Sequence, residues 1–178
     1  MSLFSIVFVI IMFILTAAFL SLAIAGVSFA PWVPTSKKDI QRIIDISQIK
    51  EGQIIYDLGC GIGTVVFEIT KQLPVSAVGF ERAWPLFLVC LWRKKLGAFK
   101  GTPNFEFGNF FKKDISKADI IYIFGMPDKI LKKLKPKMEK ELKKGTKVVS
   151  YVFPIEGWRE SKIDKISGRP QIYLYIKE

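Results

Sequence analysis

The stretch IIYDLGCGIGTVVFEIT, from Ile54 to Thr70, joins two apolar segments through a loop that holds three glycines in five residues. The first segment has the composition of a buried strand, and the second has that of a helix. Gly59, Gly61 and Gly63 lie in the turn between them. Glycine allows a tight turn and a close approach of the backbone to a ligand, and a helix start offers free N–H groups. The stretch therefore predicts a ligand-binding turn, with a turn that serves only the fold as the alternative.

Segments of strand and helix composition alternate along the rest of the chain. We expect strands at 53–58, 76–81, 104–108, 119–124, 146–153 and 171–177, and helices at 64–73, 85–98 and 129–144. Such alternation favours an α/β fold, in which helices cover both faces of a mostly parallel sheet. The final strand, at 171–177, is expected to pair antiparallel at the edge of this sheet.

The N-terminal region is apolar. The first 36 residues carry no charged side chain, and Leu3 to Ala30 is an almost unbroken apolar run. Since about 20 apolar residues in a helix cross a bilayer core, residues 1–30 are predicted to form a transmembrane helix. A cleaved signal peptide has a basic start and a shorter apolar core. The sequence AIA at Ala23–Ala25 resembles a cleavage site, so secretion stays open as the alternative.

The region after the predicted span gives the expected domain division and orientation. Residues 31–36 form a linker with two prolines, in which Trp32 suits the headgroup zone, and residues 37–178 form one domain. Thr35 or Ser36 is expected to cap the first helix of that domain. The positive residues just after the span are Lys37, Lys38, Arg42 and Lys50. The positive-inside rule then predicts a single-pass membrane protein with its C-terminal domain in the cytoplasm.

Composition excludes several kinds of site. There is no histidine, and Cys60 and Cys90 have no metal-ligand spacing, so no metal is expected. The net charge is +11, and nine lysines lie between Lys129 and Lys147. A solvated helix face is the first interpretation of these lysines and attraction to anionic lipid the second. Nucleic acid is an unlikely partner, because no base-stacking aromatics are interleaved with the lysines.

The glycine spacing limits the class of ligand that the loop can bind. A dinucleotide site has the pattern Gly-x-Gly-x-x-Gly, whereas here the third glycine comes one residue early, and no Gly-Lys-Ser/Thr follows to make a P-loop. The motif DLGCGIG, with Asp57 at its start, instead resembles the S-adenosylmethionine motif of class I, seven-strand methyltransferases. This resemblance implies a Rossmann-like sheet and S-adenosyl-L-methionine as the cofactor.

Each expected cofactor contact has a chemical reason. Asp57 would meet the cofactor's ammonium group, and Glu81, which ends the second strand 18 residues after Gly63, would accept bonds from the ribose hydroxyls. The superfamily resemblance implies that Asn109 reaches the adenine amino group. Phe110 would stack on the purine, although Phe110 and especially Phe111 also suit the core. The expected cofactor-binding set is Asp57, Gly59, Cys60, Gly61, Gly63, Glu81, Asn109 and Phe110.

A narrower resemblance rests on longer segments. LKPKMEKELKKGTKVVSYVFPIEGW, YLYIKE, PWVPTS and GNFFKKDISKADI are similar to archaeal broad-specificity protein-lysine methyltransferases and to the related membrane-anchored mitochondrial lysine methyltransferases of animals. The resemblance implies methyl transfer to lysine side chains of a protein substrate, which we expect to be membrane-associated. It also implies that Pro31 to Thr35 lies near the cofactor.

Two segments depart from these families. The predicted helix after Glu81 has seven apolar residues, Leu86–Trp92, before Arg93, Lys94 and Lys95. It is either fully buried or, over residues 84–95, rests on the membrane or against the predicted membrane helix. The sequence FGMPDK lacks the Asn/Asp-Pro-Pro-aromatic motif of adenine and glutamine methyltransferases, which argues against those substrates.

The reaction itself is less defined by the sequence. No general base is evident, and Tyr122, Tyr151 and Glu156 are candidates only by their position near strand ends. Two alternatives to a protein-lysine methyltransferase stay open. The first is a methyltransferase of a membrane lipid or quinone, and the second is a non-catalytic S-adenosylmethionine-binding membrane module.

Overall fold

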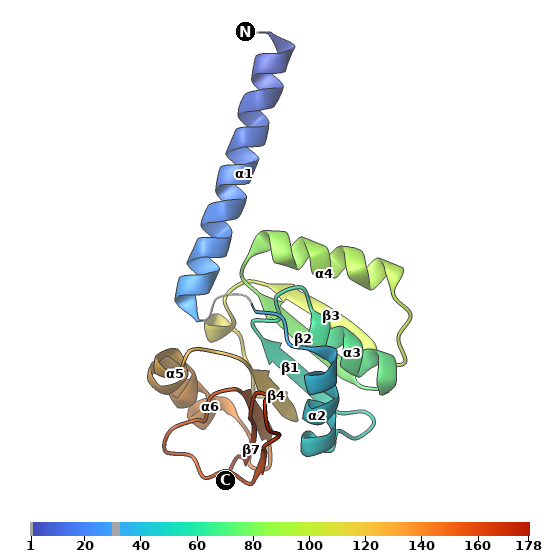
Figure 1. Cartoon of the computed structure of the whole chain (residues 1–178), viewed down its shortest axis with the longest axis vertical. Coiled ribbons are helices and arrows are strands. Elements are labelled where there is room, and N and C mark those ends of the chain that lie inside the picture. The colour runs from blue at the N-terminus through green and yellow to red at the C-terminus, as the bar shows by residue number, and fades with distance from the viewer. Residues whose placement is uncertain (1, 30–32) are drawn as a thin grey trace.

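The computed structural model describes residues 2–29 and 33–178, and within them seven strands form one sheet in the order β3-β2-β1-β4-β5-β7-β6 (Figure 1). The strands are β1 Ile54–Leu58, β2 Ser76–Glu81, β3 Thr102–Phe107, β4 Ile120–Ile123, β5 Lys147–Tyr151, β6 Lys162–Asp164 and β7 Ile172–Ile176. Strands β1 to β5 pair in parallel, and β7 runs antiparallel to β5. The predicted α/β fold with a mostly parallel sheet is confirmed.

One strand was not expected. The three-residue β6 pairs antiparallel with β7 and forms the outer edge of the sheet, so β7 lies one position inside the edge instead of at it. Strand β6 is short, exposed and charged at both ends, and therefore has no hydrophobic alternation that a sequence pattern could reveal.

The helices follow the predicted order with one correction. They are α1 Leu3–Ser28, α2 Lys37–Ser47, α3 Thr64–Gln72, α4 Trp84–Leu96, η1 Phe110–Lys112, α5 Pro127–Lys129, η2 Ile130–Leu134 and α6 Lys135–Glu141. The single helix expected at 129–144 is thus three segments, and η2 is a π-helical turn. Pro136, in the first turn of α6, has no N–H for a regular helical hydrogen bond, which explains an irregular turn just before it.

The sheet separates two layers of core. On one face, apolar side chains of α2 and α3 pack on Ile55 and Ile120, and Ser36 caps α2 as expected. On the other face, η2 and α6 pack on Ile121 and Val148. The strand order reverses from one direction to the other between β1 and β4. Ligands of open α/β sheets bind at such a point.

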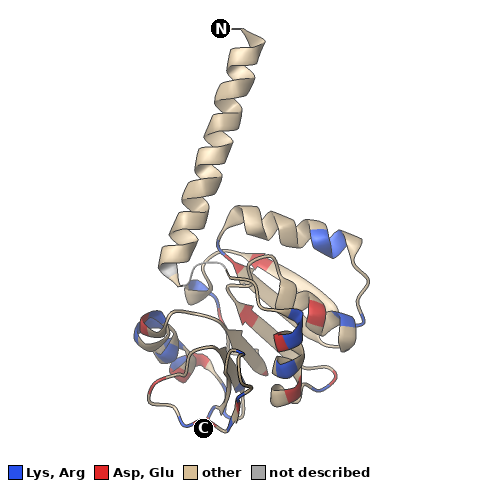
Figure 2. Cartoon of the chain, in the orientation of Figure 1, with Lys and Arg blue, Asp and Glu red and all other residues tan. Residues whose placement is uncertain are grey.

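Helix α1 extends away from the sheet and carries no charge (Figures 1 and 2). Leu3–Val27 is long and apolar enough to cross a membrane, and none of its most apolar window is buried against the domain. Two predictions lie outside the described residues. They are the end of the predicted span at Ala30 and the first part of the linker, including Trp32.

Helix α4 is not the fully buried helix that one interpretation predicted. Cys90 is its buried residue. Its outer surface exposes five apolar side chains, and Trp92 is 64% exposed. These five residues, which we call the α4 ridge, are Leu88, Val89, Leu91, Trp92 and Leu96. Helix α4 begins beside α1 and runs away from it (Figure 1).

Candidate cofactor site

The glycine loop is a tight turn from β1 into α3. Gly59, Gly61 and Gly63 have φ angles of 97°, 57° and 76°, in the left-handed region that favours glycine. At Gly63, which caps α3, a Cβ atom would also lie 2.6 Å from the ring of Phe105. A side chain at this position is therefore excluded by both the backbone angle and the space.

The neighbouring strand holds this loop in place. The amides of Gly59 and Cys60 both donate to the carbonyl oxygen of Phe80, at 3.0 Å. Just beyond, one carboxylate oxygen of Glu81 accepts from the Gly61 amide at 2.7 Å, and the other accepts from the Ala83 amide at 2.7 Å. The loop is therefore rigidly attached to the end of β2.

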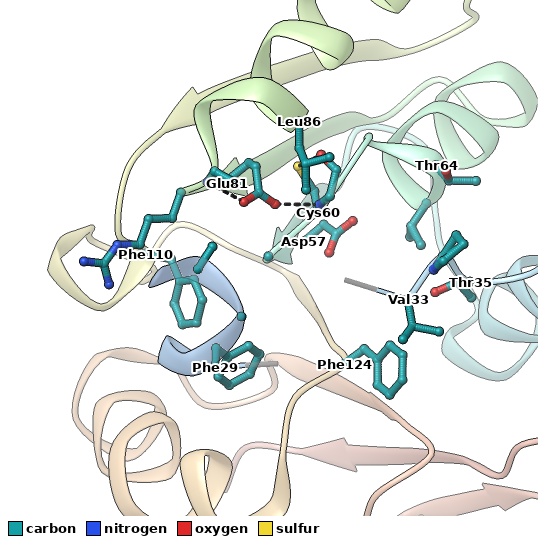
Figure 3. A pocket seen from close by; sticks show the side chains of 18 of the residues that line it. Phe29, Val33, Thr35, Asp57, Cys60, Thr64, Glu81, Leu86, Phe110 and Phe124 are labelled. Carbon is teal, nitrogen blue, oxygen red and sulfur yellow. Dashed lines mark hydrogen bonds between the residues drawn. The ribbon is translucent and has the colours of Figure 1, made fainter. Parts of the chain in front are cut away.

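A hollow lies over this loop, with about 910 Å³ of open space when its part open to solvent is counted. Figure 3 shows its lining. The predicted cofactor residues that line it are Asp57, Gly59, Cys60, Gly61, Glu81, Asn109 and Phe110. Gly63 shapes the turn from behind and does not line the hollow. Of the segment Pro31–Thr35, the described residues from Val33 onward line it as well.

Asp57 is the dominant charged group of the hollow. It is only 3% exposed, and among the described residues no hydrogen bond or ion pair reaches its carboxylate. Burial, together with the nearby Glu81, raises the pKa of Asp57 to about 8. No fully buried side-chain oxygen of the described residues lacks a partner, so the carboxylate of Asp57 reaches the open space of the hollow. A ligand that brings an ammonium group could pair with it there.

Glu81 differs from Asp57 in having partners. Burial raises the pKa of Glu81, while its backbone hydrogen bonds to Ala83, Gly61 and Arg82 oppose that rise. Because a carboxylate has about four acceptor positions, these three bonds leave at least one position for a ligand. The predicted role of Glu81 toward a ribose stays a prediction, and the structure adds that Glu81 also fixes the glycine loop.

The segment after β3 forms the next wall. The side-chain oxygen of Asn109 accepts from the Phe111 amide at 3.1 Å and so caps η1. Phe110 is buried and Phe111 is half-buried, and both line the hollow. The two rings lie 4.3 Å apart. Both phenylalanines therefore combine a packing role with a place at the site, and stacking of Phe110 on a purine stays a prediction.

The two cysteines lie next to each other below the loop. The thiol of Cys90 donates to the carbonyl oxygen of Gly61 at 3.2 Å, and burial and the contact with Cys90 raise the pKa of the Cys60 thiol. Cys60 therefore stays a neutral thiol in the wall of the hollow. Among residues 2–29 and 33–178, no cluster of three metal-ligating side chains occurs.

The three catalytic candidates lie in different surroundings. Tyr122 lines the hollow, and its hydroxyl is 2.8 Å from that of Thr35. Tyr151 donates to the buried carboxylate of Asp39 at 3.0 Å and does not line the hollow. Glu156 is exposed, and its backbone oxygen accepts from Lys135. The structure therefore brings Tyr122 to the site and leaves Tyr151 and Glu156 outside it.

Sequence patterns missed one wall of the hollow. The last two turns of α1 and the residue after it contribute Leu22, Ala25, Gly26 and Phe29. In the sequence these residues belong to the apolar run and cannot be distinguished from it. Further lining residues, for which the sequence predicted no cofactor contact, are Thr64, Arg82, Leu86 and Phe124.

Known proteins resemble this chain across the domain that carries the hollow. A family profile described as the ANTKMT methyltransferase domain matches residues 57–162. The protein-lysine N-methyltransferase of Saccharolobus islandicus (strain REY15A) is 36% identical over 154 residues, which cover 84% of this chain and 95% of that protein. The mouse adenine nucleotide translocase lysine N-methyltransferase is 26% identical over 132 residues, 72% of this chain. The match covers 56% of the mouse protein, so this chain spans little more than half of that relative's length.

A solved structure supports the assignment of the cofactor. The RNA methyltransferase from Salinibacter ruber, in complex with S-adenosyl-L-homocysteine, is 27% identical and has a TM-score of 0.76, covering 81% of this chain and 93% of that one. The hollow described above fits the same class of ligand, because it combines a buried carboxylate that lacks a partner with a glycine loop. The chain is therefore an S-adenosylmethionine-dependent methyltransferase and belongs to the ANTKMT methyltransferase family.

Proposed function

We propose that this chain is a membrane-anchored protein-lysine methyltransferase whose domain faces the cytoplasm. The observation that carries the proposal is the 36% identity to the protein-lysine N-methyltransferase of S. islandicus, over 95% of that protein. The family profile covers the hollow's central residues, from Asp57 onward.

The residues of the hollow divide the work of holding the cofactor and receiving the substrate. Asp57 would hold the cofactor's ammonium group, and Glu81 and Asn109 would hold the nucleoside. When bound, S-adenosylmethionine supplies an electrophilic methyl group that a neutral amine can attack in line. The protein's own task is therefore to place a lysine amine and to keep it uncharged.

Apolar side chains on the same hollow favour an uncharged amine. Val33, Leu86, Phe111 and Phe124 line it. An ordinary lysine has a pKa of about 10.4, and removal from water lowers the pKa of an amine because it disfavours the charged form. The released proton can pass to solvent through the open part of the hollow, so no dedicated base is required.

Tyr122 is suited to position the amine and unsuited to deprotonate it. Burial, with the nearby Asp57 second, raises the pKa of Tyr122 well above its ordinary value. The hydroxyl therefore stays protonated at neutral pH. Together with the hydroxyl of Thr35 at 2.8 Å, it offers a donor and an acceptor that can orient an incoming nitrogen.

The membrane part of the proposal rests on α1 and on the charges that follow it. Leu3–Val27 has the length of a bilayer span, and Lys37, Lys38 and Arg42 follow it without any basic residue before it. A tether of this kind raises the local concentration of substrates in the same bilayer. A protein lysine close to the membrane surface is thus the proposed target.

The α4 ridge is a second proposed contact with the bilayer. Its five apolar side chains are exposed, and Arg93, Lys94 and Lys95 follow at the end of the helix (Figure 2). Helix α4 also contacts α1, so the two proposed membrane contacts belong to neighbouring helices. An apolar ridge followed by cations is typical of a helix that rests at the headgroup level.

Fluorescence quenching tests the ridge. The full chain is placed in lipid nanodiscs that contain brominated lipids, and emission is compared with that of Trp92→Phe to isolate Trp92. We expect quenching of Trp92 that is stronger for bromine near the headgroups than for bromine at the chain ends. Emission from Trp92 that brominated lipid leaves unchanged would contradict the contact.

Methyl transfer tests the function itself. The purified chain and a Gly61→Arg control are incubated with native membranes and radiolabelled S-adenosylmethionine. Label in a protein band, recovered as methyl-lysine after hydrolysis, is the expected result. Label in the organic extract would instead identify a lipid or quinone substrate. Cofactor binding without any transfer to any membrane fraction would favour a non-catalytic binding module.

A further inference from the structure

The last turns of α1 form a wall of the cofactor hollow. Most side chains from Leu3 to Leu20 are exposed, whereas Phe29, the residue that ends the helix, is 5% exposed. Together with Leu22, Ala25 and Gly26 it lines the hollow, and a Cβ atom at Gly59 of the glycine loop would lie 3.9 Å from its ring. The apolar helix therefore has two parts, an exposed shaft and an end that belongs to the domain.

Phe29 is fixed to two segments that lie far from it in the sequence. Its ring packs edge-on against Phe110, with ring centres 5.0 Å apart, and against Phe111 at 6.0 Å. Its carbonyl oxygen accepts from the Met126 amide at 3.1 Å. Figure 3 shows the ring between Phe110 and Phe124 at the border of the hollow. Side chain and backbone thus join the helix end to both η1 and the segment after β4.

Gly125 shows that this contact is closely fitted. A Cβ atom there would overlap the ring of Phe29, and the three atoms nearest to it all belong to that ring. The φ angle of Gly125 is not positive, so the backbone at this position is compatible with residues other than glycine. The Phe29 ring is therefore what excludes a side chain at position 125.

A second attachment lies earlier on α1, at the start of α4. The Trp84 amide, at the start of α4, donates to the Ser21 hydroxyl at 3.2 Å. The first amides of a helix have no partner within it, so Ser21 satisfies a group that α4 leaves open. Helix α1 is thus attached both beside α4 and beside the segment after β4.

We propose that the end of α1, through Phe29, is a cofactor-binding element, so that docking of the membrane helix and binding of the cofactor stabilise each other. The inference rests on the proposed function only in taking α1 as the membrane anchor. A ligand that contacts both the domain and the docked helix end shifts α1 toward the docked state, and docking raises ligand affinity by the same factor. The anchor is then part of the site as well as a tether.

The test measures the binding of S-adenosyl-L-homocysteine to the full chain in nanodiscs by calorimetry. Phe29→Ala removes the wall, and Gly125→Ala forces the ring away. We expect each variant to weaken binding by at least about tenfold. The double variant Phe29→Ala/Gly125→Ala should be no weaker than Phe29→Ala alone, because the added methyl group no longer meets a ring. Phe13→Ala, at a position 75% exposed on the same helix, is the matched control and should bind like the unaltered chain.

A second readout covers the case in which a variant folds poorly. Phe29→Leu keeps apolar volume, and hydrogen exchange at the Met126 amide reports directly on its bond to Phe29. We expect S-adenosyl-L-homocysteine to slow this exchange in the unaltered chain, and to slow it less in Phe29→Leu. Unchanged affinity in Phe29→Ala, or fully additive losses in the double variant, would overturn the inference. A chain that binds this ligand but methylates no lysine would contradict the proposed function and leave the inference standing.

Discussion

Two buried aspartates near Tyr122 differ in their hydrogen-bond partners and in the direction of their pKa shifts. Asp57 is buried at the end of β1 without a partner among the described residues, and its pKa is raised to about 8 by burial and Glu81. Asp39, in the first turn of α2, is equally buried. Burial alone would raise the pKa of Asp39, but hydrogen bonds from Ser36, Arg42 and Tyr151 outweigh it and lower the pKa.

The partners of Asp39 form a closed network. Arg42 donates to Asp39 at 2.9 Å and to Asp164 of β6 at 2.6 Å, and it also reaches the carbonyl oxygen of Pro170. This network ties α2 to the antiparallel edge of the sheet. Because a buried charge is retained only where something compensates for it, Asp39 stabilises the fold through this network. Asp57 has no such network, and we expect it to act in ligand binding instead.

The largest expected effect comes from Asp57→Asn. Loss of one partner of a buried charge pair costs at least about 2 kcal/mol, which corresponds to about 30-fold weaker binding, and calorimetry with S-adenosyl-L-homocysteine measures it. The exposed Asp45→Asn is the matched control and should bind normally. Equal affinity of the Asp57→Asn variant would mean that the cofactor's charge is met elsewhere.

The same Asp57→Asn change should stabilise the ligand-free chain at pH 8. The pKa of Asp57 is about 8 in the folded chain and 3.8 in the unfolded one, so the folded state binds more protons between these values. Stability contributed by this group therefore falls as pH rises through that window. Thermal unfolding should give a higher Tm for the variant at pH 8, with the difference shrinking toward pH 4.

Asp39→Asn should have the opposite profile. We expect it to lower the free energy of unfolding by about 1–3 kcal/mol at pH 7, because Arg42 and Tyr151 lose a charged acceptor. The affinity for S-adenosyl-L-homocysteine should stay within about twofold of the original. The depressed pKa of Asp39 means that its contribution is present above pH 3.8 and is lost as pH falls through the folded-state pKa. Chemical denaturation at pH 7 and pH 3 checks both parts.

The affinity for S-adenosyl-L-homocysteine should change with pH by about tenfold per pH unit at most. Binding of a cationic ligand requires the ionised form of Asp57, so affinity should rise with pH and level off above about 8, the pKa of the free site. Calorimetry in buffers with different ionisation enthalpies should detect about one proton released per ligand near pH 7. Asp57→Asn should flatten this rise, and a rise that persists in the variant would point to Glu81.

Local patterns explain what could be predicted from the sequence. The turn from β1 into α3 is contained in 17 residues, so the glycines and Asp57 could be found without knowing the fold. Phe29 could not, because its contacts with Phe110 and Gly125 join positions about 80 and 100 residues apart, and its own surroundings in the sequence are uniformly apolar. Strand β6 was missed because charged edge strands have no alternation.

The smallest expected effects concern the two tyrosines that neighbour these aspartates. Tyr122 faces the hollow with Thr35, whereas Tyr151 is bonded to Asp39. Loss of one neutral hydrogen bond is worth about 1 kcal/mol, or about fivefold. We therefore expect Tyr122→Phe to slow methyl transfer about fivefold with unchanged affinity for S-adenosyl-L-homocysteine, and Thr35→Val to reproduce this effect. Tyr151→Phe should instead leave the rate unchanged and cost about 1.5 kcal/mol of stability, because its acceptor, Asp39, is charged. If Tyr151→Phe slows transfer while Tyr122→Phe does not, the substrate amine approaches from the Asp39 side, and the division between the two aspartates would have to be redrawn.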